Sequence, residues 1–171
     1  MIERLPQSEA HDSQRGHFAW ALHNKMTENK DIWVVSMDLG YGMLNNIRDN
    51  FPERYINVGA AEQAGMGLAV GLAKEGKIPF VYSITPFLLY RPFETIRNYI
   101  HNEQIPVKLV GGGRGRDYEH DGPSHWAEED EKIMDLLPNI KAHWPHTKEE
   151  MAPMVDLAVS DPRPYYINLR R

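Results

Sequence analysis

The sequence predicts an α/β protein of three layers, in which a mostly parallel sheet lies between helices on both faces. Short apolar runs alternate along the chain with segments of helical periodicity, as is typical of strands and helices built around a parallel sheet. The first run, 32–37, is apolar without alternation, which indicates a strand buried on both faces. Such sheets bind ligands beyond the carboxyl ends of their strands, so we expect a site among the loops at 38–45, 58–62, 84–91 and 111–125.

The composition narrows the classes of protein to which the chain can belong. Its 171 residues are 42% hydrophobic, which suffices for one domain with its own core. The absence of cysteine excludes disulfides, thiolate zinc sites and cysteine nucleophiles. A formal net charge of −5 argues against a nucleic-acid partner, and no apolar run is long enough to span a bilayer. The first residues lack the apolar stretch of a signal peptide, so we expect a cytoplasmic protein.

The first half of the chain predicts an arm, one helix and two strands. Residues 1–13 are polar and should form an arm before a domain of residues 14–171. A helix is predicted over 14–28, and strands over 32–37 and 55–58. The apolar residues that recur on one side of this helix are Phe18, Ala21, Leu22 and Met26. The residues that mark the loop between the two strands are Gly40 and Gly42.

The clearest helix of the sequence covers residues 60–75. Alanine, glycine, leucine and valine occur on every side of it, which predicts a helix buried all round. Glycine lowers helix propensity, so we expect close packing of the backbone against neighbouring elements. Gly76 is placed to end the helix.

The second half of the chain continues the alternation of strands and helices. Strands are predicted over 78–83, 106–110, 140–143 and 165–169. The helices predicted between them cover 92–103 with Phe93, Ile96 and Ile100 inward, 127–137, and 147–160 with Thr147 as its cap.

Glu62 is the first candidate for chemistry, because it opens the apolar helix. A carboxyl group in apolar surroundings has its neutral form favoured, which suits a proton donor or acceptor near neutral pH. The structural alternative is a first-turn glutamate that complements the helix dipole. The pattern of the helix leaves both roles open.

Three other clusters also have a functional and a structural interpretation. Two histidines and an aspartate in 120–125 suit a metal or the hydroxyl groups of a substrate, or form only a polar turn. Spacing places no third metal ligand, so we predict no metal site, and a metal-dependent hydrolase is the least favoured interpretation. The glycine run 111–116 suits an anion or a flexible loop, but it matches neither a P-loop nor a dinucleotide fingerprint. Aromatic residues in 85–90 could wall a flat ring or belong to the core.

Several short motifs follow one another at defined spacing. In order, they are Ala61-Glu62-Gln63 with the glycine- and alanine-rich helix, Gly76-x-x-Pro79-Phe80, Arg91-Pro92-Phe93-Glu94-x-x-Arg97, Pro106-Val107-Lys108, Asp121-Gly122-Pro123-Ser124-His125, Leu137-Pro138-Asn139-Ile140 and Trp144-Pro145. Together they resemble the pyrimidine-binding domain of the transketolase family, whose members use thiamine diphosphate. The resemblance covers about residues 14–171.

The resemblance implies a set of cofactor-binding residues. Glu62 matches the glutamate that bonds a ring nitrogen of the cofactor's aminopyrimidine, and so promotes deprotonation of the cofactor's reactive carbon. Asp38 matches an aspartate near the cofactor, and Arg91 belongs to a motif expected beside it. The family usually stacks an aromatic residue on the aminopyrimidine. Here the best match is Leu88, with Phe87 beside it.

The resemblance also implies substrate-binding residues. Asp121 and His125 match residues that contact the hydroxyl groups of a sugar, and His125 is a catalytic candidate together with Glu62. Arg15 and Arg171 match arginines that hold a sugar phosphate. A histidine usual near Gly113 is missing and the loop before the Asp-Gly-Pro turn differs, so the resemblance does not fix the sugar.

The family's other half holds the cofactor diphosphate through Mg²⁺ with a Gly-Asp-Gly motif, which this sequence lacks. The family's C-terminal domain is also missing, so we expect the small subunit of a split enzyme, active only with a partner subunit that carries the Mg²⁺-diphosphate site. A heterotetramer of two plus two subunits is the expected assembly. The isolated chain should then expose an apolar patch around the Glu62 helix and residues 84–100.

The leading hypothesis is a transferase that moves a two-carbon ketol unit between sugars or sugar phosphates. The first alternative keeps the cofactor but resembles deoxyxylulose phosphate synthase, or enzymes that decarboxylate 2-oxo acids as the pyruvate dehydrogenase beta subunit does. The Asp-Gly-Pro-Ser-His motif fits transketolase better than the latter. The second alternative is a non-catalytic partner or regulatory subunit.

Overall fold

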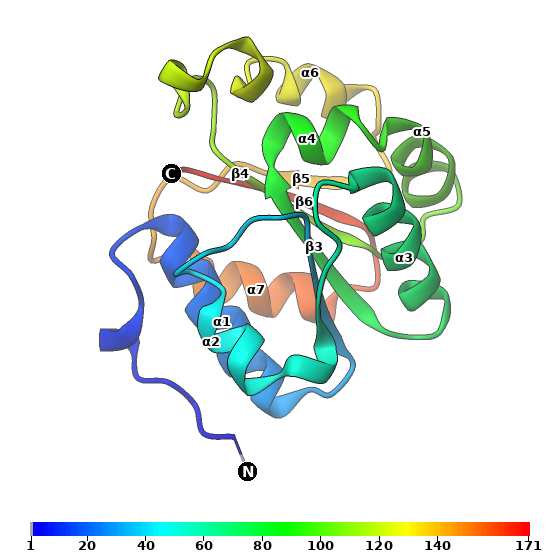
Figure 1. The fold of residues 1–171 in the computed structure, drawn as a ribbon. Coiled ribbons are helices and arrows are strands. Elements are labelled where there is room, and N and C mark those ends of the chain that lie inside the picture. The colour runs from blue at the N-terminus through cyan, green and yellow to red at the C-terminus, as the bar shows by residue number, and fades with distance from the viewer. Residues whose placement is uncertain (1) are drawn as a thin grey trace.

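Six strands form one sheet in the order β2-β1-β3-β4-β6-β5, and every pair of neighbours is parallel. The computed structural model describes residues 2–171 (Figure 1). The elements are α1 (Gln14–Glu28), β1 (Ile32–Ser36), α2 (Asn45–Asn50), β2 (Tyr55–Asn57), α3 (Glu62–Lys74), β3 (Ile78–Ile84), α4 (Thr85–Tyr90), α5 (Phe93–Thr95), the π-helix η3 (Ile96–Asn102), β4 (Lys108–Gly112), α6 (Asp130–Asp135), β5 (Lys141–His143), α7 (Met151–Ser160) and β6 (Tyr165–Leu169). The predicted three-layer α/β class is confirmed.

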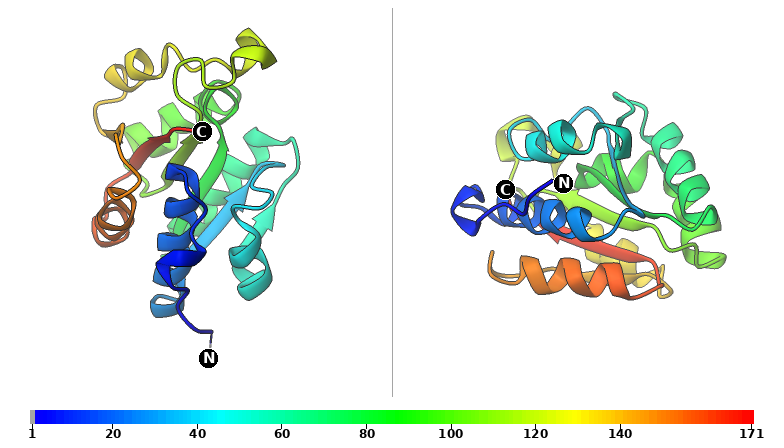
Figure 2. Two further views of the ribbon diagram at one scale, coloured as in Figure 1. Left: turned by 90° about the vertical axis from the view of Figure 1, so that its left-hand side faces the viewer. Right: turned by 90° about the horizontal axis from the view of Figure 1, so that it is seen from below.

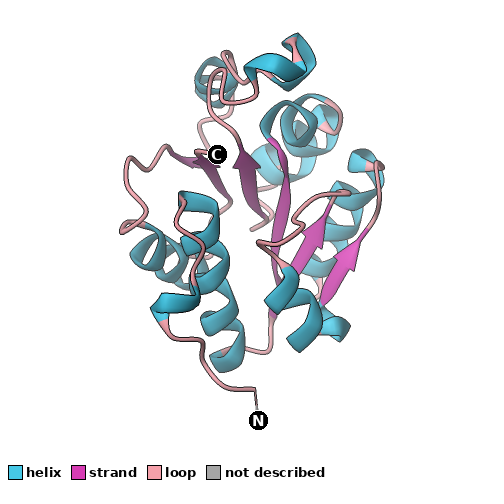
Figure 3. Cartoon of the chain, turned by 60° about the vertical axis from the view of Figure 1, so that its left-hand side comes forward, coloured by secondary structure: helices cyan, strands magenta, loops and turns pink. Residues whose placement is uncertain are grey.

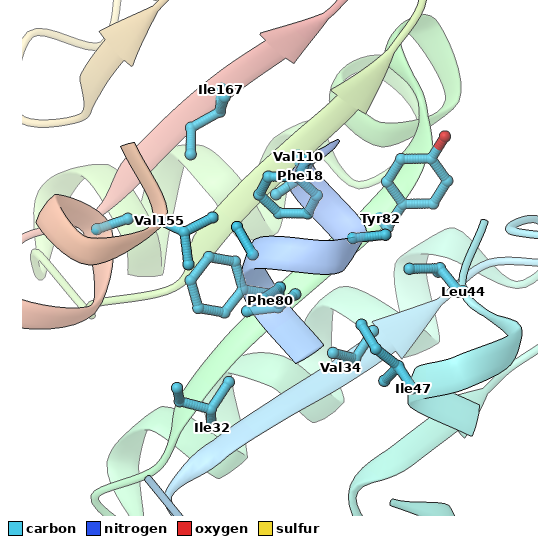
Figure 4. Close-up of a cluster of buried hydrophobic side chains, with 14 of the residues drawn as sticks. Phe18, Ile32, Val34, Leu44, Ile47, Phe80, Tyr82, Val110, Val155 and Ile167 are labelled. Carbon is cyan, nitrogen blue, oxygen red and sulfur yellow. The ribbon is translucent and has the colours of Figure 1, made fainter. Parts of the chain in front are cut away.

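Neighbouring residues of a strand point to opposite faces, and each face carries its own core. Val34 packs with the helices α1, α2 and α7, whereas Val35 packs with α3, α4, η3 and α6. Figure 2 shows these two helical layers on either side of the sheet. The core of the first face joins Phe18 of α1, Phe80 of β3 and Val155 of α7 (Figure 4). The continuous apolar run predicted for β1 therefore serves both faces.

The helix α1 begins and ends where the sequence predicts, and it also fastens the arm. Ser13 caps it by accepting a hydrogen bond from the N–H of Gly16 at 3.0 Å. The predicted arm, residues 1–13, is described from Ile2 onward. Leu5 donates its N–H to Asn24 Oδ1 at 2.7 Å, and its carbonyl accepts from Trp20 Nε1 at 2.8 Å and from Asn24 Nδ2 at 2.9 Å. The arm thus lies along α1.

The prediction that the Glu62 helix is buried all round is wrong. Its buried side includes Gly65, where a side chain would overlap Val58, so close packing does explain this glycine. Besides the polar Gln63 and Lys74, the residues that α3 leaves exposed are Ala64, Gly67, Leu68 and Gly71. A side chain at Gly67 or Gly71 would meet nothing within 4 Å. The isolated chain therefore exposes small and apolar residues on one face of α3, as expected if a partner covers that face.

Several boundaries differ from the prediction. Residues 85–90, predicted as a loop, form α4, and α2 follows the glycine loop. The helix predicted over 92–103 is divided into α5 and the π-helix η3, although Ile96 and Ile100 are buried as expected. The helix α6 is shorter than predicted, at Asp130–Asp135. Thr147 does not cap α7, because this helix begins only at Met151. The N–H groups of His146 and Thr147 instead donate to the side chain of Glu150.

No helix within residues 2–171 is both long and apolar enough to cross a membrane.

Candidate functional site at the carboxyl edge of the sheet

The loops and helices that follow the strands come together at the carboxyl edge of the sheet (Figure 3), and they carry most of the predicted site residues. The strand β3 leads directly into α4, and β4 leads into the loop 113–125. These strands are neighbours in the sheet, with Ser83 opposite Gly111 and Ile84 opposite Gly112. The segments that follow them therefore begin side by side.

Glu62 is the first residue of α3 and is only 5% exposed. The turn before it is held by Asn57, whose Oδ1 accepts from the N–H of Gly59 at 2.9 Å and from the N–H of Asp38 at 3.2 Å. Arg91 donates from Nη1 to Glu62 Oε1 at 2.6 Å. Among the described residues, the Glu62 side chain makes no other hydrogen bond, so its second oxygen, Oε2, is left for a ligand.

Arg91 connects Glu62 to an aromatic surface. Its guanidinium lies 4.0 Å from the ring centroid of Phe87 on α4. The imidazole of His125 packs edge-on against the same ring, with centroids 4.9 Å apart. Leu88 is fully buried and packs in the core beneath α4. The side chain of Phe87 therefore contacts the site residues, whereas that of Leu88 does not face them.

Tyr118 extends the surface to two arginines. Arg15 donates from Nη1 to the Tyr118 hydroxyl at 3.0 Å, and the guanidinium of Arg171 lies 4.9 Å from the ring centroid. The centroids of Tyr118 and His125 are 6.2 Å apart. We call the sequence of contacts from Glu62 through Arg91, Phe87, His125 and Tyr118 to Arg15 and Arg171 the site row. Arg15 Nε is buried without a hydrogen-bond partner among residues 2–171, which leaves a donor for an anion.

Sequence reasoning missed Tyr118 and misread the glycine run before it. Gly111, Gly112 and Gly113 are buried, and added side chains there would overlap Thr85, Tyr82 and Tyr118, respectively. The backbone of Gly113 also has a φ of +92°, which disfavours other residues. These glycines therefore admit neighbouring side chains rather than form a flexible loop. The signal was present in the sequence, because aromatic residues lie in both adjoining segments.

The hydroxyl of Tyr82 lies under this surface, where burial raises the pKa of Tyr82 to about 12. The phenol therefore remains neutral and able to donate a hydrogen bond at physiological pH.

Three predicted site residues lie outside the site row, namely Asp38, Asp121 and the buried Leu88. Asp38 is exposed and has a φ of +56°, two residues after the end of β1. Asp121 is exposed and lies 3.7 Å from His120 Nε2. Across residues 2–171, no three side chains of His, Cys, Asp or Glu lie close enough together to hold a metal ion. His120, Asp121 and His125 thus form no such group.

Comparison with known proteins places these observations in one family. The family model described as "Transketolase, pyrimidine binding domain" matches residues 13–171. A "Putative transketolase C-terminal section" of Methanocaldococcus jannaschii is 38% identical over 124 residues, which cover 70% of this chain and 39% of that protein. An apulose-4-phosphate transketolase subunit of Actinobacillus succinogenes is 34% identical over 119 residues, which cover 70% of this chain and 38% of that protein.

Solved structures agree with the sequence relatives. One titled "Split gene transketolase, inactive beta4 tetramer" is 35% identical with a TM-score of 0.82, and the match covers 94% of this chain and 52% of that chain. A transketolase from Leishmania mexicana shares the fold at a TM-score of 0.84 with 22% identity, and covers 98% of this chain and 26% of that one. The chain thus spans less than half the length of the two curated relatives named above.

Proposed function

Because this chain belongs to the family of transketolase pyrimidine-binding domains, we propose that it is the pyrimidine-activating subunit of a split transketolase that depends on thiamine diphosphate. The observation that carries the proposal is the buried carboxyl group of Glu62 at the carboxyl edge of the sheet. One of its oxygens is bonded to Arg91 and the other is left for a ring nitrogen.

The residues of the site row fit this cofactor and a sugar. Thiamine diphosphate, when bound, supplies the nucleophilic carbon that takes up a two-carbon ketol unit and passes it on. Glu62 shares a proton with the nitrogen of the pyrimidine ring. Phe87 offers an apolar surface to that ring in place of the buried Leu88. His125 donates a hydrogen bond to a hydroxyl group of the sugar.

The arginines of the site row are placed to bind the end of the substrate that is remote from its ketone. Arg15 Nε is buried without a partner among residues 2–171, and Arg171 lies over the ring of the same tyrosine whose hydroxyl accepts from Arg15. Guanidinium groups bind oxyanions through paired hydrogen bonds. We therefore expect a sugar with an anionic group at the end remote from the ketone.

The proposed enzyme needs a second subunit for the rest of the cofactor. The sequence contains no Gly-Asp-Gly motif, so a partner holds Mg²⁺ and the diphosphate. The exposed face of α3, with Ala64, Gly67, Leu68 and Gly71, follows Glu62 directly and is where we place that partner. Small residues allow a close approach of the partner's backbone. Two copies of each subunit would complete a heterotetramer.

The experiment that tests the proposal reconstitutes the chain with the partner that carries the Gly-Asp-Gly motif, in the presence of Mg²⁺ and thiamine diphosphate. A ketose phosphate and an aldehyde acceptor should yield a new ketose without release of carbon dioxide. Turnover of neither this pair nor the alternative donor, pyruvate, would contradict a catalytic role and favour a non-catalytic subunit.

One observation keeps a second reaction in consideration. A 1-deoxy-D-xylulose-5-phosphate synthase of Dehalococcoides mccartyi is 28% identical over 155 residues, covering 90% of this chain and 24% of that protein. In the same assay, this alternative predicts release of carbon dioxide from pyruvate with an aldehyde phosphate as acceptor. Transfer from the ketose alone would exclude it.

A further inference from the structure

A buried polar network lies beneath α4 and the loop 113–125, which carry the middle of the site row. Its centre is Asp130, the first residue of α6, which is 3% exposed. One carboxylate oxygen, Oδ2, accepts hydrogen bonds from Asn168 Nδ2 at 2.7 Å and from Trp144 Nε1 and the Tyr166 hydroxyl at 2.8 Å each. Burial raises the pKa of Tyr166 well above its usual value, so this phenol stays a neutral donor.

Asn168 connects this carboxylate to α4 and to the loop 113–125. It is fully buried on β6, and its Nδ2 lies 3.3 Å from Thr85 Oγ1. Thr85, the first residue of α4, donates its hydroxyl to the carbonyl of Gly113 at 2.7 Å. The N–H of Gly113 in turn donates to Leu169 of β6 at 2.8 Å. Gly113 is thus fixed on both sides where the loop leaves the sheet.

The middle of the site row depends on these two residues. Thr85 begins the helix that carries Phe87 and, directly after its last turn, Arg91. Gly113 begins the loop that carries Tyr118 and His125, and the ring of Tyr118 packs on Gly113 itself. The hydroxyl of Thr85 is therefore a direct link between the cofactor side and the substrate side of the row.

Stability alone does not explain this network, because burying a carboxylate costs folding free energy. A buried carboxylate without an adjacent cation loses its hydration, and hydrogen bonds only partly offset this loss. Within residues 2–171, Asp130 forms no ion pair; the nearby Arg114 instead donates to the carbonyls of Asn168 at 2.6 Å and Pro145 at 2.9 Å. Directional bonds of this kind select one arrangement of the elements, which apolar packing does less well.

We propose that Thr85, Asn168 and Asp130 are positioning residues, which hold the loop 113–125 against α4 so that Tyr118 and His125 face Phe87 and Arg91. This inference rests on the proposed function. The proposal further states that binding of the sugar substrate depends on the network, whereas binding of the cofactor does not.

A matched pair of variants isolates the link. Thr85→Val keeps the shape of the side chain and removes the hydroxyl, whereas Thr85→Ser keeps the hydroxyl. Thr27→Val removes a comparable hydroxyl bond, to the Asn24 carbonyl on α1, far from the loop. In the full chain, Thr85→Val should raise hydrogen exchange of the Asp117, Asp121 and His125 amides about three- to tenfold, given the usual net strength of one hydrogen bond. Thr85→Ser and Thr27→Val should leave these amides unchanged.

Kinetics of the reconstituted complex show whether fixing the loop 113–125 matters for function. Thr85→Val should raise KM for the sugar donor severalfold, with the affinity for thiamine diphosphate unchanged, and Thr85→Ser should restore the wild-type KM. Unchanged exchange, or faster exchange with an unchanged KM, would overturn the positioning role. If Thr85→Val does not fold, Asp130→Asn is read by the same two measurements. A wild-type complex without ketol transfer would overturn the proposed function alone, because the exchange rates still decide whether Thr85 fixes the loop.

Discussion

Glu62 and Arg91 are 29 positions apart in the sequence and meet through a hydrogen bond of 2.6 Å. The sequence singled out both residues, Glu62 from its place at the start of an apolar helix and Arg91 from a motif. It could not predict their pairing, which depends on how the turn after α4 passes in front of α3. Arg91 is about half exposed while Glu62 is buried, so the arginine can move aside for a ligand more easily than the glutamate.

Lys108 shows that a motif residue can be structural. It lies in the Pro-Val-Lys motif and is 1% exposed, with its ammonium group donating to the carbonyls of Asp161 at 2.8 Å and Arg163 at 2.5 Å. Burial lowers the pKa of Lys108 to about 8. It lies in β4, whose amino end is remote from the site row, so we assign it a role in fixing the loop before β6.

His23 gives a prediction about stability at the scale of one residue. It is fully buried and contacts Asn24 and Asn50 through its two ring nitrogens, and burial lowers the pKa of His23 below 6.5. The unfolded chain then takes up a proton more readily, so the free energy of unfolding should fall as the pH drops below 6.5. Denaturant unfolding at pH 7.5 and pH 5 measures this loss.

The variant His23→Gln should reduce the loss between these two pH values, because a titrating group has been removed. The exposed His120 provides the control, since His120→Gln should leave the loss unchanged. An equal pH dependence in the wild type and in His23→Gln would show that His23 does not titrate as a buried neutral group.

At the scale of elements, most of the sheet follows from the sequence. The helix α1 and the strand β6 have the predicted bounds, because continuous apolar runs and helical periodicity are local signals. The helix α4 was missed since its six residues include Pro86 and two aromatics, which suggested a loop, although proline suits a first helical turn. The π-helix η3 has no local signal and depends on packing against α3 and the sheet.

The site was predictable as a set of residues rather than as a surface. The resemblance supplied Glu62, Arg15, His125 and Arg171, and the structure joins them in the site row. Tyr118, which connects the arginines to His125, lies in a polar loop with no periodicity. Its place is set by packing on Gly113, five residues earlier, and by the hydrogen bond from Arg15, 103 positions away, which a local sequence pattern does not report.

A prediction at this scale concerns the close contact between Gly113 and Tyr118. Gly113→Ala should lower the free energy of unfolding by about 1–3 kcal/mol, because a side chain at a φ of +92° is strained and overlaps the tyrosine ring. Chemical denaturation provides the measurement. Gly115→Ala is the matched control, since Gly115 also has a positive φ but has nothing within 4 Å. Equal losses in the two variants would show that the ring of Tyr118 does not pack on Gly113.

At the scale of the whole molecule, the outer face of α3 is the feature that the isolated chain does not explain. Leu68 is 37% exposed there, and side chains at its neighbours Gly67 and Gly71 would contact nothing among residues 2–171 within 4 Å. Glycines lower the stability of a helix, and glycines that contact nothing bring no packing that offsets this loss. A partner that packs on this face would account for them.

Leu68→Asp should therefore weaken association with the partner subunit at least about tenfold, since a charge would be buried in the contact. The isolated chain should keep its free energy of unfolding within about 0.5 kcal/mol, as is usual for exposed sites. Sedimentation of the mixed subunits measures the association. Leu157→Asp on α7, where Leu157 is 44% exposed, is the control on the opposite face. Equal weakening by both variants would place the partner elsewhere.

The central claim is that Glu62 activates the pyrimidine of a cofactor shared with the partner. The variant Glu62→Gln keeps the size of the side chain and removes its ability to hold and release a proton. In the reconstituted complex, we predict that kcat for ketol transfer falls at least about 100-fold, the usual effect of losing a general acid or base, while association with the partner is unchanged. Turnover within a few-fold of the wild type would contradict the account.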